Sequence, residues 1–147
     1  WHLGEKEHWR KHALWDVSTR TPLIFSTPKG VVKDQLCESP VSLIDIYPTL
    51  IDLCGLPERA GLDGQSLKPL LENPDRKRER PVVITYGFKN HALQTERWRY
   101  IQYHDGGQEL YDHDSDPNEW TNLANNSKYQ KVVRNLQDLL RLNTIEQ

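Results

Sequence analysis

The feature that most constrains this fold is a run of alternating bulky and polar residues in the last third of the chain. Two stretches, 92–95 and 98–104, alternate in this way, and 108–112 returns after Asp105-Gly106-Gly107, which supplies the flexible backbone of a reversal. The pattern predicts a set of antiparallel hairpins with one aromatic face that another element must cover. The aromatic residues predicted for that face are Trp98, Tyr100 and Tyr111.

Two further segments complete this predicted unit. Residues 81–86 begin with a proline, which a strand tolerates at its start or edge, and continue with strongly β-forming residues. Residues 128–142 place apolar side chains on one helical face. The sequence therefore predicts about four short antiparallel strands covered by a C-terminal helix. The apolar residues of that helix are Tyr129, Val132, Val133, Leu136, Leu139 and Leu140.

The first half of the chain predicts a mixed arrangement. Residues 1–20 lack clean periodicity and predict a loop entering a short helical turn, with Trp9, Ala13 and Trp15 inward. Residues 21–25 predict a buried strand of a parallel sheet. Residues 39–55 predict the clearest helix.

Within that helix, Ser42 and Asp45 form a variant of the capping box. Pro48 predicts either a kink or a fresh helix start. Residues 66–71 add a short helical piece.

Length and charge bound the organisation of the chain. The 147 residues suffice for one average domain or two small ones. The mixed-sign run 75–80 follows Asn73-Pro74 and predicts a solvated connector. We therefore expect residues 1–75 and 76–147 to form two structural parts.

Composition argues against several function classes. The net charge of −2, with both signs interspersed, provides no basic field for a phosphate backbone, so nucleic acid is not expected as a partner. No run of 18 apolar residues exists, so no membrane span is expected. Cys37 and Cys54 lack metal-ligand spacing. A chain without methionine is expected to be an internal or C-terminal piece of a longer protein.

One acidic loop could be mistaken for a calcium site. Asp112, Asp114, Asp116 and Asn118 alternate as in a calcium-binding loop, but Pro117 stands where that loop needs a sharply turning glycine. We expect these side chains to hold the loop through hydrogen bonds to nearby backbone amides instead.

The order of residues 110–124 resembles the closing signature of the sulfatases, in the alkaline-phosphatase-like superfamily. The signature reads LYD, four residues, DP, one residue, E, two residues, NLA. Residues 1–25 resemble the region that directly follows an Asp-His-Gly or Asp-Asn-Gly triplet in that family. Both regions are most similar to the iduronate-2-sulfatase-like and choline-sulfatase-like branch. The resemblance extends to two further segments, SPVSLIDIYPTLIDLCGLP and LDGQSLKPLL.

The resemblance implies roles for three residues near the start of the chain. Lys11 falls where the family keeps the lysine that contacts the sulfate group, and an ammonium suits that task because charge develops on the sulfate as its ester bond breaks. Trp1 and His2 would lie beside the metal-binding triplet and line the substrate cleft. The implied catalytic residue is therefore Lys11, the implied substrate-binding residues are Trp1 and His2, and no metal ligand is expected.

The resemblance also implies what this chain lacks. The family nucleophile, a Cys or Ser in C/S-x-P-x-R that is oxidised to formylglycine, has no counterpart here, because Ser26-Thr27-Pro28-Lys29-Gly30 has no arginine. Calcium and formylglycine would be supplied by the N-terminal remainder of the enzyme. The expected fold is thus an alkaline-phosphatase-like α/β fragment: the end of the large α/β domain in residues 1–75, then a small α+β subdomain in residues 76–147.

The implied activity is hydrolysis of sulfate monoesters, with sulfated carbohydrate as the expected substrate, and the 147 residues alone are expected to be inactive. Two alternatives stay open: a phosphonate or phosphate ester hydrolase of the same superfamily, and a noncatalytic binding or assembly module. By resemblance the protein would be periplasmic, secreted or lysosomal. A face left bare by a missing domain would favour homo-oligomers.

Overall fold

The computed structural model describes residues 1–27, 32 and 34–144. The chain forms two compact units, one of Trp1–Pro22 with Pro81–Gln147 and the other of Leu23–Arg80. The first residues of the chain therefore pack with nearly its whole second half. The predicted division at residue 75 concerns the domains of a longer protein and stays a prediction.

The first unit is built on one antiparallel sheet of four strands in the order β1-β2-β3-β4. Gly106, with φ 88°, lies in the reversal between the last two strands, a backbone conformation that glycine adopts without steric cost. The predicted hairpin set is confirmed. The strands are β1 (Val82–Thr85), β2 (His91–Gln94), β3 (Trp98–Gln102) and β4 (Gln108–Asp112).

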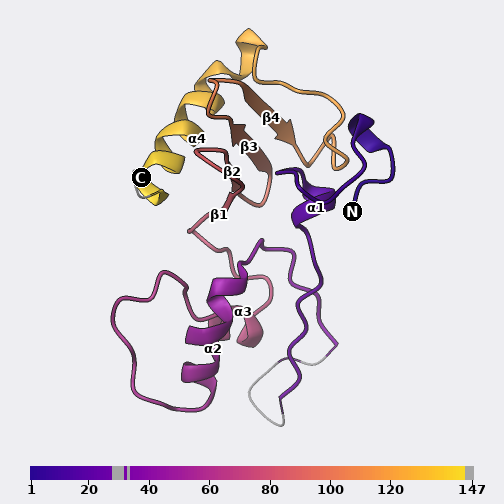
Figure 1. Ribbon diagram of the computed structural model, residues 1–147. Coiled ribbons are helices and arrows are strands. Elements are labelled where there is room, and N and C mark those ends of the chain that lie inside the picture. The colour runs from indigo at the N-terminus through magenta and orange to yellow at the C-terminus, as the bar shows by residue number, and fades with distance from the viewer. Residues whose placement is uncertain (28–31, 33, 145–147) are drawn as a thin grey trace. The chain divides into compact units, whose positions relative to one another are not determined.

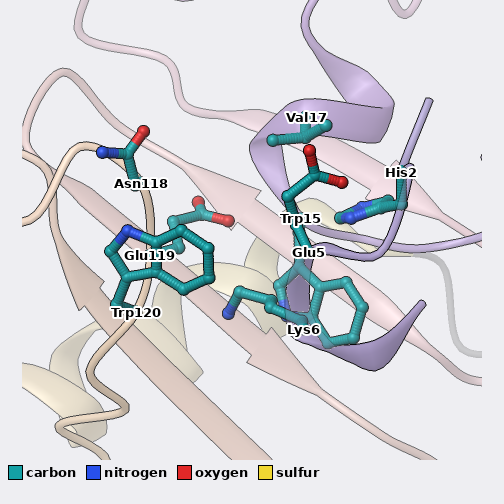
Figure 2. A pocket seen from close by; sticks show the side chains of 8 residues that line it. All are labelled: His2, Glu5, Lys6, Trp15, Val17, Asn118, Glu119 and Trp120. Atoms are coloured by element: carbon teal, nitrogen blue, oxygen red, sulfur yellow. The ribbon is translucent and has the colours of Figure 1, made fainter.

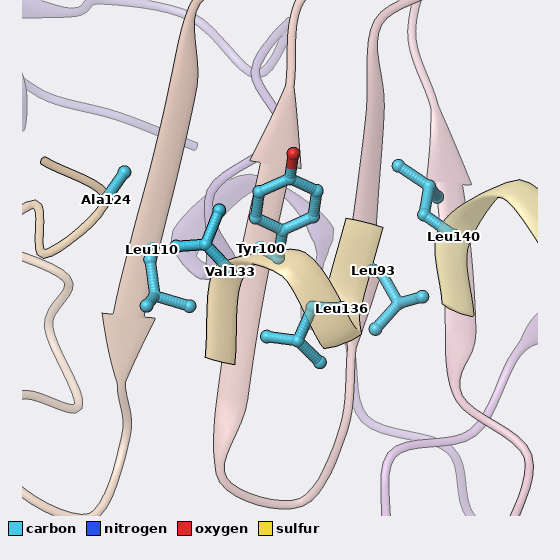
Figure 3. Close-up of a cluster of buried hydrophobic side chains, with 7 residues drawn as sticks. All are labelled: Leu93, Tyr100, Leu110, Ala124, Val133, Leu136 and Leu140. Atoms are coloured by element: carbon cyan, nitrogen blue, oxygen red, sulfur yellow. The ribbon is translucent and has the colours of Figure 1, made fainter. Parts of the chain in front are cut away.

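A long amphipathic helix covers one face of this sheet. Helix α4 (Gln130–Asn143) follows the 3-10 turn η3 (Ser127–Tyr129), and Figure 1 shows it lying across the strands. Because the side-chain period of a strand is two, alternate residues of neighbouring strands meet the helix. The predicted sheet with a C-terminal helix is confirmed. The buried cluster between them, drawn in Figure 3, comprises Leu93, Tyr100, Leu110, Ala124, Val133, Leu136 and Leu140.

The opposite face of the sheet is also buried, and residues near the N-terminus cover it. Leu14 packs there against Ala92, Ile101 and Tyr111. The prediction that Tyr111 shares the aromatic face of Tyr100 is therefore wrong. The two lie on neighbouring strands in the register Tyr100↔Leu110, so that Leu110 faces the helix and Tyr111 faces the other way.

The covering segment has little regular structure. It contains the 3-10 turn η1 (Glu5–Glu7) and the one-turn helix α1 (Asp16–Thr19). Lys6 and Glu7 have φ of 53° and 58°, so the backbone of this turn is left-handed at two non-glycine residues. Trp9 was predicted inward but is exposed, whereas Trp15 is partly buried against the core as predicted and Leu14 is fully buried.

The second unit contains the predicted helix in a modified form. A 3-10 turn η2 (Leu43–Asp45) with the predicted capping box leads into α2 (Ile46–Leu53), and α3 (Lys68–Glu72) follows. Pro48 lies in the first turn of α2, where a missing N–H breaks no helical hydrogen bond. The Asp45 carboxylate also binds Arg78 at 2.6 Å and thereby links the start of this helical segment to the C-terminal end of the unit.

Residues 21–25 do not form the predicted strand. They have no regular secondary structure, none of the described strands pairs with them, and Ile24 is 85% exposed. A strand needs a hydrogen-bonding neighbour, which the described part of the chain does not provide here. None of the described helices combines the length and apolar character needed to cross a bilayer.

Candidate functional site

The three predicted site residues lie in the N-terminal segment but in different surroundings. Lys11 is exposed. Trp1 is 66% exposed, whereas His2 is 1% exposed. Of the three, His2 alone is buried, and the predicted roles of all three stay predictions.

His2 lies in a group of three rings. Its ring centroid is 5.2 Å from that of His8 and 5.4 Å from that of Trp15, both in edge-to-face arrangements. Burial lowers the pKa of His2, and the neighbouring His8 adds to this effect. Neither ring nitrogen of His2 has a hydrogen-bond partner among the residues that the structure describes.

A pocket of about 270 Å³ opens beside this ring group (Figure 2). One wall comes from the N-terminal segment, including His2, and the other comes from the loop that follows β4. Of the three predicted site residues, only His2 lines this pocket. The remaining lining residues are Glu5, Lys6, Trp15, Val17, Asn118, Glu119 and Trp120.

Lys6 is one of the pocket residues that the sequence did not identify as site residues. Its Nζ donates to the Tyr111 hydroxyl at 2.8 Å and lies 4.1 Å from the centroid of that ring and 4.8 Å from that of Trp15. Burial lowers the pKa of Lys6, although the carboxylate of Glu109 opposes the shift. No sequence pattern indicates that this lysine, rather than its neighbours, turns inward.

Glu109 collects the polar atoms on the same face of the sheet. Its Oε2 accepts hydrogen bonds from Trp15 Nε1 at 2.6 Å and from the Tyr111 hydroxyl at 2.5 Å, and its Oε1 accepts one from Tyr103 at 2.9 Å. Burial and the nearby Glu109 charge raise the pKa of both tyrosines. Glu109 thus satisfies buried donors that an apolar interface would leave unpaired.

A buried ion cluster fastens the N-terminal segment to the sheet. Arg99, on β3, donates from Nη1 to the carbonyl oxygen of Leu14 at 2.9 Å and from Nη2 to Asp16 Oδ1 at 2.8 Å. Its Nε lies 2.6 Å from Glu119 Oε1. The side chains of Arg99 and Glu119 are each 2% exposed, so neither charge is solvated by bulk water.

Glu119 completes the cluster from the loop after β4. Its Oε2 accepts from the backbone N–H of Asp16 at 2.9 Å, and His113 Nε2 lies 2.8 Å from its Oε1. Burial alone would raise the pKa of Glu119, but the hydrogen bond with His113 and the charge of Arg99 outweigh it and lower the pKa.

The acidic loop has the turn chemistry expected from the sequence. Asp116 accepts from the backbone N–H groups of Trp120 at 3.0 Å and Thr121 at 2.7 Å, and Arg97 forms two hydrogen bonds with Asp112. Within this loop Glu119 has a left-handed backbone conformation, with φ 58°. Among the residues that the structure describes, no three His, Cys, Asp or Glu side chains are grouped so that they could hold a metal ion.

Comparisons with known proteins identify the family. The model of the family described as N-sulphoglucosamine sulphohydrolase, C-terminal, matches residues 4–146. A sulfatase from Formosa agariphila is 42% identical over 138 residues, which is 94% of this chain and 27% of that protein. Arylsulfatase K of Gallus gallus is 34% identical over 152 residues, covering 93% of this chain and 28% of that protein.

Solved structures agree on the fold. A protein in complex with its substrate, D-glucosamine-2-N,6-O-disulfate, has a TM-score of 0.60 at 27% identity, covering 67% of this chain and 22% of that chain. The phosphonate monoester hydrolase of Agrobacterium radiobacter has a TM-score of 0.54 at 26% identity, covering 68% of this chain and 25% of that chain.

The chain spans about a quarter of the length of the curated relatives that it matches, 27% and 28% of the two named above. The alkaline-phosphatase-like fold expected from the sequence is confirmed by the family match and the solved neighbours, whereas the iduronate-2-sulfatase-like branch stays a prediction. This chain therefore belongs to the family of N-sulphoglucosamine sulphohydrolase C-terminal domains, within the sulfatases.

Proposed function

We propose that this chain is the closing part of an enzyme that hydrolyses sulfate monoesters of sugars. The observation that carries the proposal is the family match over residues 4–146. The substrate class is supported by the solved neighbour that binds a disulfated glucosamine as its substrate. The N-terminal remainder of the enzyme is then the obligatory partner of this chain.

Within that reaction, Lys11 would contact the sulfate group. Its side chain is exposed, while the backbone around it is fixed by hydrogen bonds from His2 N–H to the carbonyl of Arg10 at 3.1 Å and from Ala13 N–H to the carbonyl of Lys11 at 2.9 Å. A fixed cation that meets the charge developing on the sulfate oxygens lowers the barrier without reorganising during the reaction.

Calcium and formylglycine would belong to the part of the enzyme outside this chain. The described residues hold no cluster of His, Cys, Asp or Glu for a metal ion. The contribution of this chain to the reaction is then the Lys11 cation and the scaffold that holds it.

The test is Lys11→Ala in the complete enzyme, assayed on an aryl sulfate. Turnover should fall at least about tenfold, since losing a transition-state contact costs more than about 1.4 kcal/mol. Lys131→Ala, an exposed lysine of α4, is the matched control and should leave the rate unchanged. An unchanged rate for Lys11→Ala would remove this lysine from the active site.

A phosphonate or phosphate ester hydrolase is the second candidate, supported by the phosphonate monoester hydrolase among the solved neighbours. Both candidates need a cation at the developing oxyanions, so the Lys11 substitution does not separate them. The two candidates are separated by comparing the hydrolysis rates of a sulfate ester and a phosphate ester with the same leaving group. We expect the sulfate ester to react faster.

A further inference from the structure

The N-terminal segment is held to the sheet at points that closely follow Lys11 in the sequence. Arg99 reaches the carbonyl oxygen of Leu14 at 2.9 Å and the Asp16 carboxylate at 2.8 Å. Upstream, His2 N–H binds the carbonyl of Arg10 at 3.1 Å. The backbone of Lys11 therefore lies between a hydrogen bond inside the N-terminal segment and the contacts that Arg99 makes from β3.

We infer that Arg99 is a positioning residue for Lys11, and this inference rests on the proposed role of Lys11 in sulfate binding. The planar guanidinium makes contacts in three directions at once: the Leu14 carbonyl, the Asp16 carboxylate and, through Nε, Glu119. A lysine ammonium keeps the positive charge but lacks the planar fork that donates to Leu14 and Asp16 from two separate nitrogens while it lies in ion-pair contact with Glu119. Arg99 acts through the backbone and does not itself touch the substrate.

Glu119 serves as the counterpart that orients Arg99. It binds Arg99 Nε with one carboxylate oxygen and the Asp16 N–H with the other. The segment that carries Lys11 is thus held by side chains of β3 and of the loop after β4. In a site where a displacement of about 1 Å can cost roughly a hundredfold in rate, such an anchor sets catalytic efficiency.

The test is a double-mutant cycle in the complete enzyme with an aryl sulfate as substrate. Arg99→Lys should lower kcat/KM at least about tenfold in the wild-type background and less than about twofold in the Lys11→Ala background. Loss of general stability would lower kcat/KM by the same factor in both backgrounds, so equal factors overturn the inference.

Arg97→Lys is the matched control. Arg97 lies two residues before Arg99, is half exposed and pairs with Asp112 rather than with the N-terminal segment. Its substitution should change kcat/KM less than about twofold in either background.

A gentler variant covers the case in which Arg99→Lys does not fold. Asp16→Asn keeps an oxygen for Arg99 at a partly exposed side chain and should lower kcat/KM about threefold, with the same dependence on Lys11. If both variants leave kcat/KM unchanged, the inference fails while the proposed function stands. If Lys11→Ala is silent, the role of Lys11 and the inference fail together.

Discussion

At the residue scale, the buried pair of Arg99 and Glu119 is the chemically demanding feature of this chain. Both side chains are 2% exposed, so each charge depends on the other and on the polar atoms of Leu14 and Asp16. Removing one member of a buried pair leaves an uncompensated charge and typically costs about 3–5 kcal/mol. The Glu119 carboxylate should therefore influence how firmly the N-terminal segment is held.

Glu119 should make this attachment dependent on pH. Its pKa is lowered from an ordinary value of 4.5, so the unfolded chain binds more protons than the folded one below that value, and the stabilisation is lost as pH falls through the folded-state pKa. We expect hydrogen-exchange protection of the Asp16 amide to weaken below pH 4.5. In Glu119→Gln the protection should be lower throughout and nearly independent of pH over this range. Identical pH profiles for the two proteins would contradict the assignment.

At the element scale, helix α4 and the sheet form a core that sequence patterns predict well. The alternation in residues 92–112 and the apolar stripe of the helix each follow from one periodicity, and both are found where expected. The other face of the sheet could not be predicted in this way. It is covered by an irregular segment in which Leu14 is buried and Trp9 is exposed, and no helical or strand period distinguishes the two.

The core beneath α4 gives a direct stability prediction. Leu136 is buried against the sheet, whereas Leu142, on the same helix, is 83% exposed. Leu136→Ala should lower the free energy of unfolding by about 2–5 kcal/mol because it removes buried contacts and leaves a cavity. Leu142→Ala should change it by less than about 0.5 kcal/mol. Urea denaturation of the two variants measures the difference, and equal losses would mean that α4 does not cover the sheet.

The difference between local sequence patterns and contacts between distant residues also explains which site residues could be predicted. The resemblance to the sulfatases predicted roles for Lys11, Trp1 and His2, because the order of motifs can be read from the sequence alone. The inward turn of Lys6 and the link between Asp16 and Glu119 depend on contacts across more than 100 residues of sequence. Such contacts leave no local pattern, although the glutamate of the closing signature marks one end of this link.

At the scale of the whole molecule, the unit containing the sheet is discontinuous in sequence. Residues 1–22 supply the cover for the sheet formed by residues 81–112, while residues 23–80 form a separate compact unit. The C-terminal part is therefore not independent of the segment that resembles the end of the catalytic domain. The sheet face opposite α4 is apolar, and Ala92, Ile101 and Tyr111 on that face are all buried.

Removing residues 1–22 should expose that face. A chain of residues 23–147 should bind an apolar fluorescent dye more strongly than the full chain, because Leu14 and Trp15 no longer cover Ile101. A synthetic peptide of residues 1–22 should reverse the effect, and the same peptide with Leu14→Asp should not. Equal dye binding by the full and shortened chains would contradict the described cover.

The pairing of the two ends of this chain also has a consequence for biosynthesis. Asp16 and Glu119 are separated by 103 residues, and the ribosome makes the N-terminal partner first. The segment that carries Lys11 therefore cannot be anchored until β3, with Arg99, and the loop that contains Glu119 have been synthesised and folded. Chains terminated before Glu119 should therefore leave the N-terminal segment without this anchor, although the whole segment had already been translated.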